Sequence, residues 1–241
     1  AGSTRNQGVE IVLDVNPIAK KDFNWNIRLN FNRMWNEVLS LPASVTEYYL
    51  ADTWIYLNAR GGVIQGNPTT TITAYGYQRN NRGDILISPT TGLPVNDPIF
   101  RIRGDRNPDF TLGTLNSFRY KNWNLSFLWD LKVGGDVFNG THMFMTINGK
   151  SKQTADRMTP RVIQGVLQDG RENTANPTVN NIVITPYYNE QFYGSVAMPE
   201  EAYIEKDVNW FRLRDLSLSY MFTQKQTRLI KQIKTLSAFV T

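Results

Sequence analysis

The chain has 241 residues, of which 41% are hydrophobic, 20% are charged and 12% are aromatic, and its formal net charge is +5. This composition excludes a disordered chain, and the lack of cysteine excludes a disulfide framework, a thiol nucleophile and cysteine-bound zinc. No apolar run approaches the ~20 residues of a membrane-spanning helix, so a membrane crossing would have to use strands. The basic residues are scattered through expected loops, which argues against a nucleic-acid partner.

The first two expected strands, residues 7–17 and 22–37, alternate between apolar and polar side chains. In the second strand one set of alternate positions holds Phe23, Trp25, Ile27, Leu29, Phe31, Arg33 and Trp35. The positions between them hold Asn24, Asn26, Arg28, Asn30 and Asn32. Because successive side chains of a strand point to opposite faces, this pattern predicts one nearly apolar face and one face of amides and guanidinium.

Four further strands follow, separated by connections of very unequal length. We expect them at about residues 109–121, 123–132, 209–222 and 235–241. Short links alternate with two long segments, about residues 40–108 and 134–208. Connections above ~15 residues are unusual in compact domains, whereas outer-membrane barrels combine short periplasmic turns with long extracellular loops. The pattern therefore predicts an all-β fold, an antiparallel transmembrane β-barrel segment of about six strands with two long extracellular loops.

Aromatic residues recur at a spacing that suits a lipid-facing band. The pairs Trp25 and Trp35, Phe110 and Tyr120, and Trp210 and Tyr220 are each ten residues apart. Ten residues of a strand tilted by ~40° rise about 25 Å, the height of the band between two aromatic girdles. The same aromatics could instead form the core of a soluble sheet, but strand length and loop asymmetry favour the membrane. The expected lipid-facing girdle comprises Trp25, Trp35, Phe110, Tyr120, Trp123, Trp210 and Tyr220.

The fifth strand contains two arginines that interrupt its pattern. Arg212 and Arg214 share parity with Trp210 and Tyr220. An arginine facing lipid at mid-depth costs ~2–4 kcal/mol, falling to ~0–1 kcal/mol near the interface. We therefore expect either a bulge near Asp215 or both arginines above the membrane.

Several segments, in the same order along almost the whole chain, carry a recognisable set of motifs. They include Arg5-Asn6-Gln7-Gly8-Val9-Glu10, Phe23-Asn24-Trp25 with Asn30-Phe31-Asn32, Asn107-Pro108-Asp109-Phe110, Tyr120-Lys121-Asn122-Trp123 and Phe211-Arg212-Leu213-Arg214-Asp215-Leu216. This ordered set resembles the SusC/RagA group of TonB-dependent outer-membrane transporters, typical of Bacteroidota. Arg33 to Glu37 departs from the Asn/Lys run that is more usual in the group.

The resemblance implies a location, a function and partners. The whole protein would be a 22-stranded barrel in the bacterial outer membrane, in contact with its lipid. It would import a glycan or peptide substrate with energy delivered through TonB. A SusD-like surface lipoprotein would sit on the long loops. The group carries a plug domain before this point and closing strands after it; neither is found in this sequence, so we expect a partial barrel. The expected lumen-facing candidates for substrate binding are Asn24, Asn26, Arg28, Asn30 and Asn32.

Residues able to do chemistry are sparse, so we expect no enzyme, no metal site and no cofactor. His142 lacks identifiable partners for a zinc site or a catalytic triad. A solvated loop is the expected setting of the acidic residues Asp169, Glu172, Glu200, Glu201, Glu205 and Asp207, which lack EF-hand spacing for calcium.

Two questions stay open at the level of the sequence. The aromatics Tyr187, Tyr188, Phe192 and Tyr193 could stack on sugar rings or pack the loop onto its neighbours. The alternative function, from another class, is a soluble all-β binding or adhesion module with long loops. Extraction discriminates between the two functions, because a membrane barrel needs detergent and a soluble module does not.

Overall fold

The computed structural model describes residues 2–49, 59–189, 192–194, 197–227 and 235–241. The chain divides into two compact units. The barrel unit contains residues 6–35, 107–135 and 207–241, and the loop unit contains residues 1–5, 36–106 and 136–206. Within the described part of the chain, no helix has the length and apolar character needed to cross a membrane.

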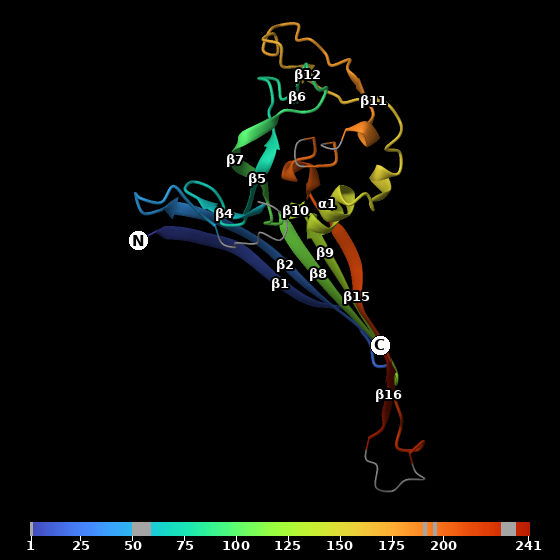
Figure 1. The fold of residues 1–241 in the computed structure, drawn as a ribbon. Coiled ribbons are helices and arrows are strands. Elements are labelled where there is room, and N and C mark those ends of the chain that lie inside the picture. Colours follow the sequence, from blue (N-terminus) through green and yellow to red (C-terminus); the bar gives the residue numbers. More distant parts are fainter. Residues whose placement is uncertain (1, 50–58, 190–191, 195–196, 228–234) are drawn as a thin grey trace. The chain divides into compact units, whose positions relative to one another are not determined.

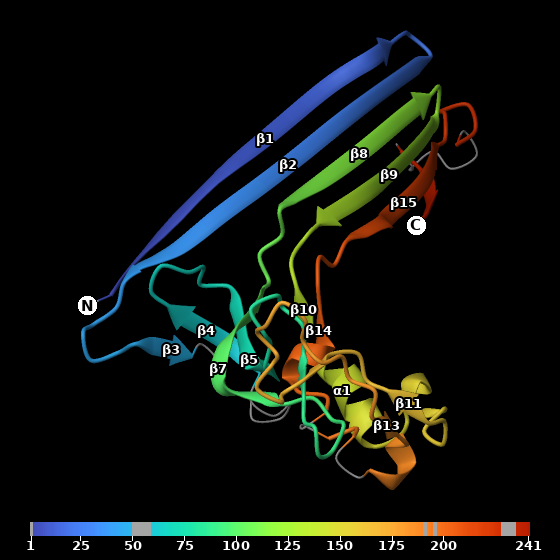
Figure 2. The ribbon, with the colours of Figure 1, turned by 90° about the horizontal axis from the view of Figure 1, so that it is seen from above.

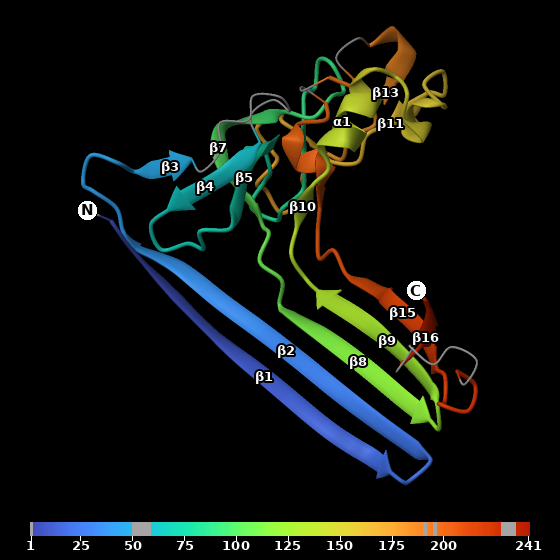
Figure 3. The ribbon, with the colours of Figure 1, turned by 90° about the horizontal axis from the view of Figure 1, so that it is seen from below.

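The barrel unit is built on a six-stranded sheet (Figures 1, 2 and 3). In spatial order its strands are β1 (Ser3–Ala19), β2 (Phe23–Ser40), β8 (Phe110–Tyr120), β9 (Trp123–Val133), β15 (Trp210–Met221) and β16 (Ser237–Val240). The pairings from β2 through β16 are antiparallel. The predicted all-β fold is confirmed, although β1 is longer and β16 shorter than the sequence pattern indicated.

Tight connections join neighbouring strands at one end of this sheet. The turn between β8 and β9 places Lys121 in the left-handed region with φ of 51°, beside Asn122. The Lys121 N–H donates to the carbonyl of Asp22, in the turn between β1 and β2, at 2.8 Å. Adjacent turns therefore support one another, which fixes the hairpin register at this end of the sheet.

The loop unit is an ordered fold of its own. A four-stranded sheet contains β3 (Glu47–Tyr49), β4 (Arg60–Ile64), β5 (Thr71–Tyr77) and β7 (Asn96–Asp105). Three two-stranded pairings join β6 (Leu86–Ile87) to β12 (Val166–Leu167), β10 (Val137–Phe138) to β14 (Ile204–Glu205), and β11 (Arg161–Val162) to β13 (Val183–Ile184). The described helices are α1 (Gly140–Ile147) and the 3-10 turns η2 (Lys152–Thr154), η3 (Pro186–Tyr188) and η4 (Glu200–Tyr203). Because β6 and β12 come from different long segments, the two expected loops fold together.

Two small apolar clusters form the core of the loop unit. One contains the buried residues Ala59, Ile72, Ala74 and Ile204, with Phe138 packed against them. The other contains Leu93, Ile184, Phe192 and Ala197, with Ile163, Ile182 and Tyr193 packed against them. Each cluster draws residues from both long segments, so apolar burial holds the two segments together.

A pair of carboxylates extends the edge of strand β5. The described pairing of β5 with β4 ends at Thr73, and the β5–β7 register is irregular between Ala74 and Gly76. The Tyr75 N–H donates to Glu200 Oε2 at 2.9 Å, and the Tyr77 N–H donates to Glu201 Oε2 at 3.0 Å. Buried backbone donors need such acceptors, so η4 takes the place of a neighbouring strand here.

The charge of Glu201 is compensated within the loop unit. Arg79 lies 2.8 Å and Arg103 lies 3.2 Å from its carboxylate oxygens, and Arg103 also pairs with Asp97 at 2.8 Å. Glu200 is only 3% exposed. The expectation that Glu200 and Glu201 belong to a solvated loop is therefore wrong, because backbone N–H groups and arginines 100 residues or so away in the sequence meet them.

We predict that Gly76→Ala weakens this carboxylate contact. A Cβ at Gly76 would lie 1.9 Å from Glu201 Oε2 and 2.6 Å from Arg103 Cζ, so both side chains would have to move. Loss of the acceptor for the Tyr77 N–H costs about 1–3 kcal/mol. Hydrogen exchange should show faster exchange at Tyr75 and Tyr77.

The matched control is Gly113→Ala in β8, where nothing lies within 4 Å of the added Cβ. This variant should keep wild-type exchange at Tyr75 and Tyr77. Unchanged exchange in Gly76→Ala would show that the carboxylates do not hold the β5 edge.

Candidate functional site: the two faces of the barrel sheet

The register of the sheet sorts side chains into two chemically different faces. Phe23, Trp25, Ile27, Leu29 and Phe31 lie opposite Tyr120, Phe118, Asn116, Thr114 and Leu112, respectively. The same face continues onto β9 with Trp123, Leu125, Phe127, Trp129 and Leu131. We call this side the apolar face and the opposite side the polar face.

An aromatic row crosses the apolar face beside the short turns. Phe23 pairs with Tyr120, Tyr120 pairs with Trp123, and Tyr220 also pairs with Trp123. The ring centroids of Trp123 and Tyr220 are 4.7 Å apart. Phe23 therefore aligns with the three expected girdle residues Tyr120, Trp123 and Tyr220.

Trp25 lies one step further along the strand than this row. Its ring stacks on Phe118 with centroids 5.5 Å apart, and its Nε1–H donates to Asn116 Oδ1 at 3.2 Å. This contact gives the polar group of Asn116 a partner on a face that is otherwise mostly apolar, and such pairing lowers the cost of placing an amide there.

The remaining expected girdle residues of β2 and β8 lie towards the other end of the sheet. Phe110 stacks on Phe31 with ring centroids 5.6 Å apart. Trp35 is 43% exposed, and the guanidinium of Arg33 lies 5.0 Å from its ring centroid. That these residues face lipid stays a prediction.

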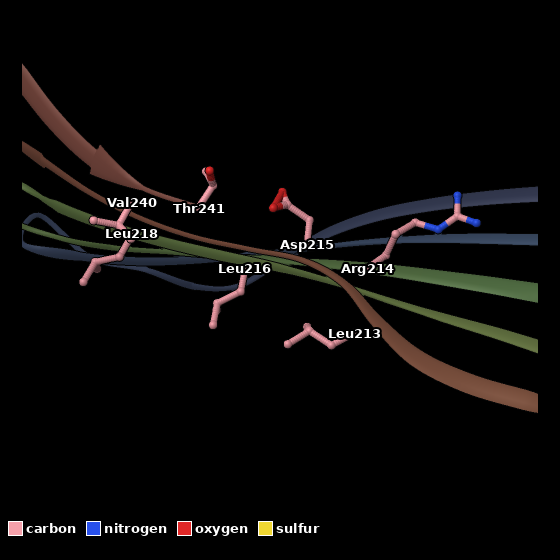
Figure 4. A pocket seen from close by; sticks show the side chains of 7 residues that line it. All are labelled: Leu213, Arg214, Asp215, Leu216, Leu218, Val240 and Thr241. Carbon is pink, nitrogen blue, oxygen red and sulfur yellow. The ribbon is translucent and has the colours of Figure 1, made fainter.

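A β-bulge in β15 resolves the conflict posed by the two arginines. Leu213 pairs with Trp129 and Asp215 pairs with Leu128, so Arg214 is an extra residue without a partner on β9. Figure 4 shows Leu213, Leu216 and Leu218 pointing to one side of the strand and Arg214 and Asp215 to the other. The bulge expected near Asp215 is confirmed, and it keeps both Leu213 and Leu216 on the apolar face.

The bulge also corrects the expected position of Trp210. Before the bulge, Trp210 pairs with Lys132 and Arg212 pairs with Asp130, both on the polar face. The Arg212 guanidinium lies 4.1 Å from the Trp210 ring centroid. The expectation that Trp210 shares the apolar face with Tyr220 is therefore wrong, because one extra residue reverses the parity between them.

Asp130 holds both arginines on the polar face. Its carboxylate lies 3.0 Å from Arg214 and 3.6 Å from Arg212. Asp130 is largely buried, with 18% of its side chain exposed, whereas each arginine is about half exposed. The sequence could have indicated this contact, because Asp130 lies between two apolar-face residues of β9 and so must point to the polar face.

The expected lumen-facing residues do share one face. Asn24, Asn26, Arg28, Asn30 and Asn32 lie opposite Arg119, Ser117, Leu115, Gly113 and Thr111, respectively. Asp14 of β1 accepts from Asn26 Nδ2 at 2.6 Å and from Arg28 Nη2 at 2.8 Å. Within the described residues, no side-chain hydrogen bond is found for Asn24, Asn30 or Asn32.

The described residues of the loop unit include side chains of the types that metal sites and catalysis use. No group of three or more His, Asp or Glu side chains able to hold a metal ion occurs among the described residues. His142 packs edge-on against Tyr203 with ring centroids 5.7 Å apart, and its backbone N–H donates to Asn139, the N-cap of α1. His142 is therefore a structural part of the α1 start.

The four loop aromatics separate into two environments. Tyr187 and Tyr188 are 60% and 77% exposed, and their rings meet edge to face. Phe192 is buried in an apolar cluster, and Tyr193 packs beside it. Phe192 therefore packs the loop, whereas Tyr187 and Tyr188 remain open to a partner or solute.

We predict that the two faces of β2 differ in their access to lipid. The chain has no cysteine, so single cysteines at Ile27 and Asn26 can each carry one spin label. A lipid-soluble quencher should relax the label at Ile27 strongly and the label at Asn26 weakly, because the two side chains lie on opposite faces. Equal relaxation at the two positions would overturn the membrane orientation.

We also predict that deleting residue Arg214 lowers the stability of the protein far more than replacing its side chain with that of alanine. Deletion removes the bulge and turns Arg212 towards the apolar face, at a cost of up to ~2–4 kcal/mol in lipid. Arg214→Ala keeps the bulge and loses one half-exposed ion pair, worth about 0–1 kcal/mol. Denaturant unfolding in vesicles measures the stability of both variants. Equal unfolding midpoints for the deletion and for Arg214→Ala would contradict the role given to the bulge.

Comparison with known proteins returns one consistent group. No family model matches the chain. The chain is 25% identical over 240 residues to the TonB-dependent receptor P3 of Formosa agariphila, covering 91% of this chain and 22% of that protein. It is 23% identical over 230 residues to the TonB-dependent receptor SusC of Bacteroides thetaiotaomicron, covering 92% of this chain and 21% of that protein.

Solved structures agree on the fold. The RagAB peptide transporter superposes with a TM-score of 0.61 at 19% identity, covering 99% of this chain and 25% of that chain. The RagAB peptide importer in its open-open state gives a TM-score of 0.60 at 18% identity, covering 100% of this chain and 26% of that chain.

The chain spans about a fifth of the length of the curated relatives that it matches. These relatives are outer-membrane receptors and transporters rather than enzymes. The sequence relatives, the matching barrel fold and the ordered motifs together support a likeness of this chain to the SusC/RagA-type TonB-dependent receptors.

Proposed function

We propose that this chain forms part of the barrel wall of an outer-membrane importer that takes up oligosaccharides or peptides with energy delivered through TonB. The observation that carries the proposal is the two-faced antiparallel sheet, with an aromatic row on its apolar face and amides on its polar face. Its agreement with a transporter barrel in solved structures supports the proposal.

The direction of the two faces follows from the cost of placing charge in lipid. An arginine at mid-depth in lipid costs ~2–4 kcal/mol. Arg28, Arg119, Arg212 and Arg214 all lie on the polar face. We therefore assign the apolar face to the membrane lipid and the polar face to the lumen of a 22-stranded barrel.

The lumen wall favours polar, hydrogen-bonding solutes. Asn24, Asn30 and Asn32 present both donors and acceptors, and an amide can match either a sugar hydroxyl or a peptide group. In our proposal these residues, with Asn26 and Arg28, contact the solute during passage. The RagAB structures are described as a peptide transporter and importer, which supports the peptide half of the proposed substrate range.

We assign the protein partner to the loop unit. Large apolar side chains are exposed there, including Phe144 at 59%, Met158 at 55% and Val183 at 64%. Exposed apolar side chains contribute to an interaction surface where they form a contiguous patch. We propose that a SusD-like surface lipoprotein covers this unit, as the resemblance to the SusC/RagA group implies.

Uptake by living cells tests the proposal. In the host bacterium, deletion of the gene should reduce accumulation of fluorescent peptides or oligosaccharides to background, and the intact gene should restore it. A protonophore should abolish the restored uptake, because energy reaches such transporters through TonB. Uptake that continues in the deletion strain, or that ignores the protonophore, would contradict the proposal.

Extraction separates the proposal from the soluble binding module. The proposed importer should sediment with the outer membrane and need detergent for release. A soluble, monodisperse protein in detergent-free buffer would favour the binding or adhesion module instead.

A further inference from the structure

A partly open cavity of about 230 Å³ in the loop unit is lined by residues of both long segments. Tyr77 and Pro94 come from the first segment, whereas Ile163, Phe192 and Tyr193 come from the second. Ligand pockets for drug-sized molecules run from ~300 to 1,000 Å³. The volume therefore suits a single ring or a branched side chain.

The polar groups that line the cavity are mostly occupied by the protein itself. Tyr77 Oη donates to the carbonyl of Ala197 at 3.2 Å. Gln153 Nε2 donates to Thr146 Oγ1 at 2.6 Å. Arg161 pairs with the carboxylate of Asp156 at 2.9 Å. These contacts fix the walls and leave little hydrogen-bonding capacity for an incoming molecule.

Tyr193 is the exception. Its hydroxyl is buried and has no hydrogen-bond partner among the described residues. Buried polar atoms are nearly always paired, so an unpaired one calls for a water or a ligand atom. Burial raises the pKa of Tyr193, which keeps the hydroxyl protonated and able to donate.

The walls themselves suit a flat, mainly apolar guest. The rings of Phe192 and Tyr193 meet edge to face, with centroids 4.9 Å apart and planes at 80°. Such a corner offers both a ring edge and a ring face to an aromatic guest. Ile85, Ile163 and Met198 complete the apolar lining.

We propose that this cavity binds a ring-sized, mainly apolar group that carries one hydrogen-bond acceptor, as the side chain of a tyrosine in a peptide does. A sugar ring is a poorer guest, because each buried hydroxyl without a partner costs free energy and Tyr193 Oη is the only fully buried polar side-chain atom of the described lining that lacks a partner. Binding of such a group in the cavity does not depend on the proposed function. The role of the cavity in selecting a peptide for import does rest on the proposed function.

The test uses the full gene product, purified in detergent, and water-soluble probes. N-acetyl-L-tyrosinamide carries the phenol hydroxyl, N-acetyl-L-phenylalaninamide lacks it, and methyl α-D-glucopyranoside represents a sugar. Saturation-transfer NMR titration should show both amino-acid probes binding, with the tyrosine probe tighter, and the glucoside binding more weakly than either.

Variants locate the binding. Tyr193→Phe should weaken the tyrosine probe about fivefold, the value of one buried hydrogen bond, and leave the phenylalanine probe unchanged. Ala197→Phe, which fills the cavity, should weaken both amino-acid probes at least tenfold. Tyr188→Phe removes a hydroxyl from a tyrosine that is 77% exposed, and should change neither affinity.

Three outcomes would overturn the proposal: no amino-acid probe binds, the glucoside binds most tightly and loses affinity in Tyr193→Phe, or Tyr193→Phe weakens both amino-acid probes equally. These outcomes are distinguishable from failure of the proposed function. Probe binding to purified protein needs no energised uptake. A failure of probe binding therefore does not contradict uptake by cells, and a failure of uptake does not contradict probe binding.

Discussion

The alternation of side chains, held in register from β2 to β15, is the constraint on which the barrel unit depends. A shift of one residue would exchange the apolar and polar faces of a strand. The register between β2, β8 and β9 continues without interruption over ten or eleven pairs, and the aromatic row beside the turns forms because it does. Among these pairings a register shift occurs only in β15, between Leu213 and Asp215, where the backbone inserts a bulge instead of turning arginine towards the apolar face.

The loop unit follows a different rule, because its backbone lacks long regular pairing. Its buried donors and charges find partners far away in the sequence. Tyr75 and Glu200 are 125 residues apart, and Tyr77 and Glu201 are 124 residues apart. Burial of Tyr77 raises its pKa to about 12, and the nearby Glu201 carboxylate acts in the same direction, so this hydroxyl remains neutral at any physiological pH. The two long segments are consequently tied together by polar contacts as well as by apolar clusters.

The sequence predicted the sheet well because the alternation of apolar and polar side chains can be recognised in each strand separately. The six strands, the two faces and the bulge could all be anticipated from residues such as Phe23 to Arg33 and Arg212 to Asp215. The position of Trp210 could not, because its face depends on which single residue is the extra one. The folded state of residues 40–108 and 134–208 was also beyond reach, since contacts such as Glu201 with Arg79 join distant segments that carry no shared pattern.

The apolar face of the sheet tolerates polar residues less well than the polar face tolerates apolar ones. This difference explains which features of the sheet could be predicted from the sequence. An apolar residue on a polar face costs little: Leu115 and Leu128 pair there, beside Arg28 and Asp215. A polar residue at an apolar-face position costs more, and a hydrogen-bonding side chain or a change in backbone register can lower that cost. Asn116 is bonded by the indole of Trp25, and Arg214 is turned away by a bulge. Asn116 and Arg214 therefore each have a structural answer, and isolated polar residues at apolar positions of such sequences are places to look for bulges and capping side chains.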